Sequence, residues 1–138
     1  MMETEEMKAS DPRMPVLYIS GPYSAPTPEG IKKNIDLARA VGIDLMRRGF
    51  AVIIPHCNTQ NFEVYAPDLT YTQYLDMDCE LLRRLDPKHD GIVMLPGYRE
   101  SKGAIREFLT AIRLGLNVWK WPHGPGTCTI ICEEEKDA

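Results

Sequence analysis

The sequence predicts an α/β protein, a single domain built on a parallel sheet flanked by helices, and three observations predict it. The chain has 138 residues, which is enough for one hydrophobic core but too few for two domains. Short apolar runs alternate along it with longer segments whose apolar residues recur at helical spacing. Continuous apolar runs are typical of strands buried on both faces, as in a parallel sheet between two layers of helices.

The first half of the chain has two apolar runs with a helical pattern between them. Residues 16–20 and 51–54 are the expected strands. Thr27 followed by Pro28 is a typical helix start, an N-cap with proline in the first turn. Apolar residues then recur with the helical period as far as Gly49, where we expect the helix to end.

The middle of the chain begins with a segment that has no periodicity. Residues 57–70 contain Asn, Pro and Asp, and a loop of that length in a compact domain favours a functional loop or a lid. A second helix is expected over residues 71–85, because its apolar positions again follow the helical period. Residues 91–95 are a third apolar run and a third expected strand.

The last third of the chain has clear helix boundaries. Ser101 is the expected N-cap of a helix over residues 102–114, and Gly115 ends it. Residues 117–119 form a short fourth strand, and residues 127–132 are a possible edge strand. Strands that alternate with helices in this way give a Rossmann-like, flavodoxin-like sheet with helices on both faces.

Ligands of such sheets bind beyond the carboxyl ends of the strands. The segments that follow the first three strands are residues 21–24, 55–56 and 96–101, so we expect them along one crevice. The third helix begins there, and a glycine in its first turn leaves room for a ligand to approach the backbone. The candidate binding residues are Gly21, Pro22, Tyr23, Ser24, His56, Pro96, Gly97, Ser101 and Gly103.

The net charge of −4 lies in the two ends of the chain. Residues 1–15 contain two basic and four acidic residues, and residues 133–138 contain one basic and four acidic residues. Residues 16–132 therefore carry a net charge of +1, and we expect them to be the domain between two acidic tails. A nearly neutral domain without a run of Lys and Arg excludes a duplex DNA binder, so no nucleic acid polymer is expected as a partner.

Membrane and export signals are also missing from the sequence. No apolar stretch approaches the ~18–20 residues of a membrane span, and the N-terminal segment is acidic with no apolar signal core. The four cysteines are scattered, and Cys128 and Cys132 do not have the spacing of a zinc knuckle. We therefore expect reduced thiols in a cytoplasmic protein that needs no metal.

A carboxylate interrupts the apolar stripe of the second helix. The stripe consists of Tyr71, Tyr74, Leu75, Leu81, Leu82 and Leu85. Asp78 falls in its middle, where a carboxylate is costly unless it is partnered or functional. Burial would raise its pKa, which suits a general acid. The alternative is a structural Asp that is hydrogen-bonded to a loop backbone.

A second carboxylate stands out in the third helix. The expected core face of that helix is Ile105, Phe108, Leu109 and Ile112. Glu107 lies at the border of this face, and none of the residues three or four positions away is basic, so the usual helix salt bridge is unavailable. Ser101 and the free amide groups of the first helical turn form an anion site, unless Ser101 is only an N-cap. Two carboxylates beside an anion site suggest glycosidic bond chemistry, in which one is the nucleophile and the other handles protons.

Four motifs carry a resemblance to a known family. They are Tyr18-Ile19-Ser20-Gly21-Pro22-Tyr23, Pro55-His56, Tyr74-Leu75-x-x-Asp78 and Leu95-Pro96-Gly97-x-x-x-Ser101-x-Gly103-x-x-x-Glu107. Together they resemble the nucleoside 2-deoxyribosyltransferase superfamily, which includes the 2′-deoxynucleoside 5′-phosphate N-hydrolases. The resemblance covers residues 16–119, most of the chain.

The resemblance implies roles for single residues. Glu107 matches the catalytic glutamate that attacks C1′ of the sugar, and Tyr18 matches the tyrosine that orients it. Asp78 matches the aspartate that assists the leaving base or holds the sugar. The family implies no cofactor, and it implies a homodimer or a larger homo-oligomer in which a neighbouring subunit completes the pocket.

The choice of substrate depends on fewer residues. Ser101 matches a serine that binds the 5′-phosphate in the nucleotide hydrolases, whereas Pro22 and Ser24 stand where those enzymes have Ser and Arg. The leading expectation is an N-glycosidase acting on nucleoside 5′-monophosphates. Two alternatives stay open, a deoxyribosyltransferase that exchanges bases and a nucleotide-binding module without turnover.

Overall fold

The computed structural model describes residues 13–123 and shows a sheet of four parallel strands. In spatial order these are β2 (Ala51–Ile53), β1 (Val16–Ser20), β3 (Gly91–Met94) and β4 (Asn117–Lys120). Most of the predicted acidic tails and the possible strand at residues 127–132, with its two cysteines, lie outside the described residues. The parallel sheet flanked by helices confirms the predicted α/β, Rossmann-like class.

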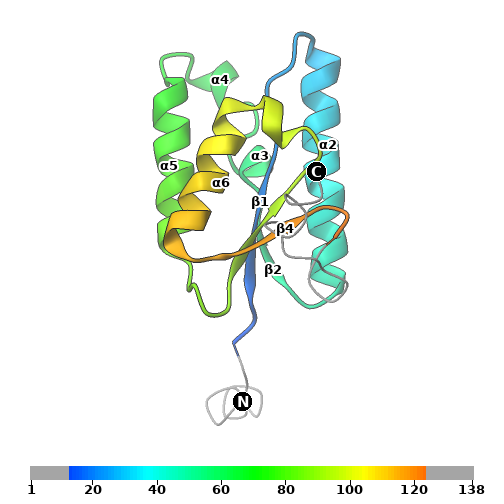
Figure 1. Ribbon diagram of the computed structural model, residues 1–138. Helices are drawn as coiled ribbons and strands as arrows, with labels where there is room; N and C mark the ends of the chain where they lie inside the picture. The colour runs from blue at the N-terminus through cyan, green and yellow to red at the C-terminus, as the bar shows by residue number, and fades with distance from the viewer. Residues whose placement is uncertain (1–12, 124–138) are drawn as a thin grey trace, which may run out of the picture.

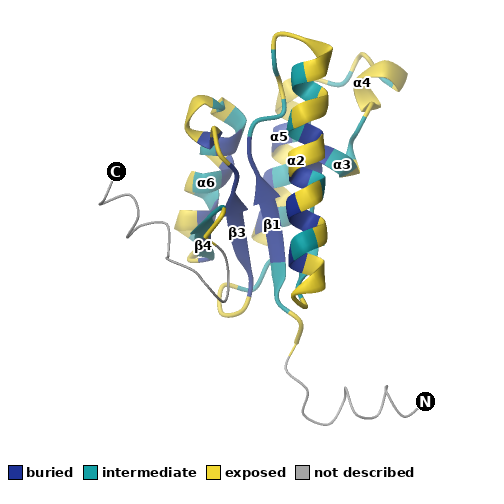
Figure 2. Ribbon diagram, turned by 90° about the vertical axis from the view of Figure 1, so that its right-hand side faces the viewer, coloured by how far each residue is buried: buried dark blue, intermediate teal, exposed yellow. Residues whose placement is uncertain are grey.

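Helices cover the two faces of the sheet (Figure 1). Side chains alternate between the faces along each strand, so Leu17 and Ile19 of β1 pack toward α2 (Pro28–Arg47), while Tyr18 points the other way. The second face carries α5 (Tyr71–Arg83) and α6 (Lys102–Leu114). Figure 2 shows β1 and β3 buried between the two layers. The central strands are therefore apolar on both faces, as the continuous apolar runs predicted.

Side-chain caps mark the first residues of the three long helices, α2, α5 and α6, which begin where the sequence predicted. Thr27 accepts a hydrogen bond from the backbone N–H of Gly30 at the start of α2. At the start of α5, Thr70 and Gln73 bond each other's backbone in a capping box. Ser101 accepts from the N–H of Ala104 at the start of α6. The bounds of α6, including its end at Gly115, match the prediction.

The structure corrects the predicted loop over residues 57–70. It contains the end of α3 (Pro55–Asn58) and the whole of α4 (Phe62–Tyr65). Ile54 also leaves the predicted second strand, because it precedes the proline that begins α3. Helices of four residues are about one turn long, too short for a helical period to be visible in the sequence. A short 3-10 helix, η1 (Tyr98–Glu100), lies before α6.

The buried face of α6 also differs from the predicted one. The buried residues of α6 are Ala104, Glu107 and Ala111, whereas Leu109 and Ile112 are 45% and 46% exposed. The helix meets the sheet through small side chains, and two of its larger apolar ones are left outside. Glu107 therefore lies in the core rather than at its border.

Other sequence interpretations concern residues away from the crevice. His89 and His123 are exposed, as predicted. Trp119 and Trp121 pack against the core on the α2 side of the sheet, in agreement with a structural role. No helix within residues 13–123 is long and apolar enough to cross a membrane.

Candidate active site

A cavity of about 890 Å³ opens beyond the carboxyl ends of the strands. Ten of the twelve residues predicted for the site line it, namely Gly21, Pro22, Tyr23, Ser24, His56, Asp78, Gly97, Ser101, Gly103 and Glu107. Tyr18 is fully buried behind Glu107 and does not line the cavity. Pro96 is exposed and does not line it either. The topology therefore brings the predicted segments together at one place.

Glu107 is buried, with both of its carboxylate oxygens held by hydroxyl groups of β1. The Tyr18 hydroxyl donates to Oε2 at 2.7 Å, and the Ser20 hydroxyl donates to Oε1 at 2.5 Å. Tyr18 and Ser20 are two positions apart in a strand and so share one face. Burial raises the pKa of Glu107, and the hydrogen bonds from Ser20, Tyr18 and Asp78 lower it. These bonds offset part of the cost of a buried carboxylate.

Tyr18 stays protonated and acts as a donor. Burial raises its pKa well above 10, and the nearby charges of Glu107 and Asp78 raise it further. It touches the carboxylate and not the cavity, so it is a positioning residue. Ser20, which has the same contact with Glu107, was missed in the sequence. The available signal was its position two residues after Tyr18 in the same strand.

Asp78 faces Glu107 from α5. Burial raises the pKa of Asp78 to about 7, and the charge of Glu107 and a hydrogen bond with it contribute in the same direction. Its Oδ1 is buried and has no hydrogen-bond partner among residues 13–123. Asp78 is therefore the more readily protonated of two interacting carboxyl groups near neutral pH, in line with a proton donor rather than a helix-surface charge.

Within the described part of the chain, two further buried polar atoms of cavity-lining residues have no hydrogen-bond partner. They are Nδ1 of His56 and the hydroxyl oxygen of Tyr74. The His56 Nε2–H donates to the carbonyl of Pro22 at 2.9 Å, so Nδ1 is left as an acceptor. Burial lowers the pKa of His56, which keeps the ring neutral. Buried polar groups are normally hydrogen-bonded, so these atoms are available to a ligand in the cavity.

The N-terminus of α6 opens into the same cavity. Ser101, Lys102 and Gly103 line it, and the first amide groups of a helix have no partner within the helix. A Cβ on Gly103 would lie 3.1 Å from the Tyr71 hydroxyl, so glycine lets this tyrosine lie close over the first turn. A helix N-terminus with a nearby lysine favours a negatively charged ligand group.

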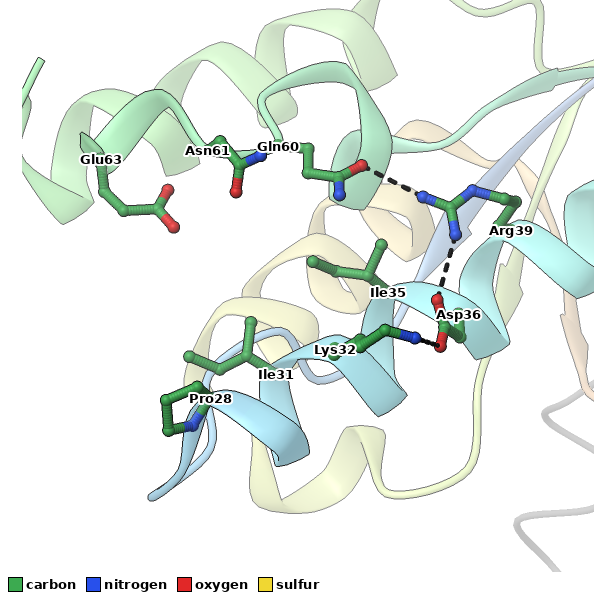
Figure 3. A pocket seen from close by; sticks show the side chains of 9 residues that line it. All are labelled: Pro28, Ile31, Lys32, Ile35, Asp36, Arg39, Gln60, Asn61 and Glu63. Atoms are coloured by element: carbon green, nitrogen blue, oxygen red, sulfur yellow. Dashed lines mark hydrogen bonds and ion pairs between the residues drawn. The ribbon is translucent and has the colours of Figure 1, made fainter. Parts of the chain in front are cut away.

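Residues 60–63, at the start of α4, border the cavity on the α2 side. Glu63 of α4 accepts a hydrogen bond from the Tyr23 hydroxyl at 3.2 Å, and both residues line the cavity. A second, smaller cavity of about 450 Å³ lies between α2 and residues 60–63, and Figure 3 shows the side chains that line it. Across it, Arg39 of α2 donates to Gln60 at 3.1 Å, and Asp36 of the same helix accepts from Arg39 at 3.1 Å. The bond to Gln60 joins residues 60–63 to α2.

Sequence reasoning did not assign several residues of the cavity to a site. They include Ile31, Thr59, Glu63, Tyr71, Tyr74, Leu75 and Glu100. Tyr71 and Tyr74 were placed in the apolar stripe of their helix, although Tyr71 is 60% exposed. Within residues 13–123, no group of three or more His, Cys, Asp or Glu side chains is arranged to hold a metal ion.

These features define a Rossmann-like α/β protein with two interacting carboxyl groups at one cavity. The chain belongs to the family described as "Domain of unknown function (DUF4406)", whose model matches residues 15–120. This match includes every residue of the cavity. No curated protein matches the chain. Because the family description names no activity, the function has to be argued from the site.

Proposed function

We propose that the protein is an N-glycosidase that cleaves the bond between base and sugar in nucleoside 5′-monophosphates. The observation that carries this proposal is the pair formed by Glu107, held at both oxygens by hydroxyl groups, and Asp78, whose pKa is raised to about 7. Two carboxyl groups with different proton affinities are what glycosidic bond cleavage requires. The resemblance to the nucleoside 2-deoxyribosyltransferase superfamily supports the same assignment.

The first step of the proposed reaction forms a glycosyl-enzyme intermediate. An oxygen of Glu107 attacks C1′, and the electrons of the C1′–N bond pass to the base. Asp78 gives its proton to the leaving base nitrogen. The charge of Glu107 stabilises the positive charge that develops on the sugar.

The second step returns both carboxyl groups to their starting state. The Asp78 carboxylate takes a proton from a water molecule, and the water oxygen attacks C1′. The bond between C1′ and Glu107 breaks, and its electron pair returns to the carboxylate. The products are the free base and the sugar 5-phosphate, with retained configuration at C1′.

The α6 N-terminus is proposed to bind the 5′-phosphate. The Ser101 oxygen accepts from the N–H of Ala104 at 3.2 Å, so its own proton remains available to a phosphate oxygen. Lys102 lines the cavity beside it. The unpartnered atoms of His56 and Tyr74 then remain for the sugar and the base.

The test is to incubate the protein with each deoxynucleoside monophosphate and to follow free base by chromatography. We expect base release that Glu107→Gln lowers by at least about 10³-fold, because the amide is not a nucleophile. Glu80→Gln is the matched control, since Glu80 pairs with Arg83 and Arg84 on the exposed face of α5. Its activity should equal that of the wild type.

The same assay distinguishes the alternatives. A second free base in the mixture would be converted into a new nucleotide by a transferase, whereas a hydrolase yields only sugar phosphate. Binding of nucleotides without release of base from any of them would contradict both enzymatic functions and favour a binding module.

A further inference from the structure

Glu107 accepts a hydrogen bond from the hydroxyl group of Ser20 in addition to the one from Tyr18. From this geometry we infer that Ser20 is a positioning residue that holds Glu107 in its reactive, ionised orientation. The inference rests on the proposed function, because it names the residue on which that nucleophile depends. It extends the proposed site by one residue, which the sequence analysis placed in a motif without giving it a role.

The position of Ser20 is fixed from several sides. It is the last residue of β1, 1% exposed, and lies opposite Met94 in the pairing with β3. Its carbonyl accepts a hydrogen bond from the N–H of Leu95 at 2.7 Å. A hydroxyl group on so constrained a backbone has little freedom, so its bond to Glu107 restricts the rotation of the carboxylate.

The two hydroxyl groups bond to different oxygens of the Glu107 carboxylate. Tyr18 bonds Oε2 and Ser20 bonds Oε1. A carboxylate oxygen has two acceptor sites, so neither hydroxyl group by itself saturates the oxygen that it bonds. With only one of the two hydroxyl groups, the carboxylate could turn about the remaining bond.

Asp78 on α5 is the ionisable side chain that interacts with Glu107 beside the hydroxyl groups of Tyr18 and Ser20. Among the other elements packed against α6, η1 carries Tyr98, Arg99 and Glu100 and β4 carries Lys120, while β3 has no titratable side chain. The hydrogen bonds of Ser20, Tyr18 and Asp78 are those that lower the Glu107 pKa. Two donors on Glu107 direct the shared proton of the pair to Asp78, whose Oδ1 finds no hydrogen-bond partner in the region that the structure describes.

Removal of the Ser20 hydroxyl should therefore affect the reaction and not the binding of substrate. Ser20→Ala should lower kcat about tenfold, in keeping with one lost hydrogen bond to a charged group, and leave KM within about twofold. The pKa of Glu107 should rise, so the acidic limb of the kcat/KM profile should move to higher pH. Ser20→Cys, which keeps a weak donor of similar shape, should lie between Ser20→Ala and the wild type.

The control is Thr110→Val, which removes a hydroxyl group from α6 itself. Thr110 donates to the Arg106 carbonyl at 2.8 Å and does not line the cavity. It should leave kcat and the pH profile unchanged. An unchanged acidic limb in Ser20→Ala would overturn the inference, even if kcat fell.

A measurement without substrate separates this inference from the proposed function. The Glu107 carboxyl resonance, assigned by its absence in Glu107→Gln, is titrated by carbon-13 NMR in the wild type and in Ser20→Ala. A higher Glu107 pKa in Ser20→Ala supports the inference, and an equal pKa overturns it. Absence of base release from every nucleotide would overturn the proposed function alone, because the titration does not depend on turnover.

Discussion

The two ends of the sheet each contain a buried carboxylate, and the two are held in different ways. At the N-terminal ends of the strands, Asp90 is 8% exposed, and its oxygens accept hydrogen bonds from the backbone N–H groups of Val16 at 2.8 Å and Asp86 at 2.7 Å. At the carboxyl ends of the strands, Glu107 is 6% exposed and accepts hydrogen bonds from two side-chain hydroxyl groups, beside the carboxyl group of Asp78.

The difference shows what burial of a carboxylate means in this fold. Asp90 ties the start of β1 to the turn after α5, so its bonds serve the chain path. Glu107 and Asp78 do not hold a turn in place. Burial, together with the nearby Glu107, raises the pKa of Asp78, and this costs stability once Asp78 ionises. A buried acid bonded to backbone amides is therefore structural, whereas a pair of acids at one cavity is a candidate for chemistry.

The largest expected effect is on catalytic activity, where Asp78 and Asp90 should behave differently. Asp78→Asn should lower kcat by roughly 10²–10⁴-fold, because it removes the proposed proton donor, whereas Asp90→Asn should leave the activity of the folded protein within about twofold. Wild-type activity should fall as the pH rises through about 7, where Asp78 loses its proton. Asp78→Asn should lack this fall. An equal loss of activity in both variants would remove the distinction between the two ends.

The next largest effect is on the stability of the fold, and it should be seen at Asp90. Asp90→Asn replaces one acceptor oxygen with an NH₂ group that faces a backbone donor, so it should lower the free energy of unfolding by about 1–3 kcal/mol. Urea denaturation measures it. Asp76→Asn, on the exposed side of α5, is the control and should change stability by less than about 0.5 kcal/mol. An unchanged stability in Asp90→Asn would contradict the structural role of Asp90.

The smallest effect concerns the pH dependence of stability. A carboxyl group whose pKa is raised in the folded state disfavours folding once it ionises, so the cost is absent below its usual pKa of 3.8 and complete above about 7. Asp78→Asn should therefore gain roughly 1–2 kcal/mol over the wild type between pH 5 and pH 8. That is less than the full difference in pKa implies, because Asp78 is partly exposed. A gain that is independent of pH would contradict the raised pKa.

The sequence predicted well those features that are marked by local chemistry. Ser101 and Gly115 bound α6 because capping needs particular residue types, and the four apolar runs correspond to the four strands. Asp78 and Glu107 were identified because a charge on an apolar face is conspicuous. Both lie at the cavity, while the substrate inferred from them stays a prediction.

What the sequence could not predict depends on how closely elements pack. A hydrophobic pattern ranks Leu109 and Ile112 above alanine, but α6 approaches the sheet through Ala104 and Ala111. The Ser20 contact likewise arises between residues 87 positions apart in the chain. Helices of one turn, such as α4, leave no period to detect.

The anchoring of Glu107 on β1 has a consequence for how such a protein can change over time. Its two hydroxyl partners belong to a central strand that is buried on both faces, where a substitution disturbs the whole core. Glu63, in contrast, reaches the cavity from α4, whose Val64 and Tyr65 are 71% and 84% exposed. A substitution that alters the rim of the cavity is therefore tolerated most readily in the outer segment, whereas one at Tyr18 or Ser20 also disturbs the core.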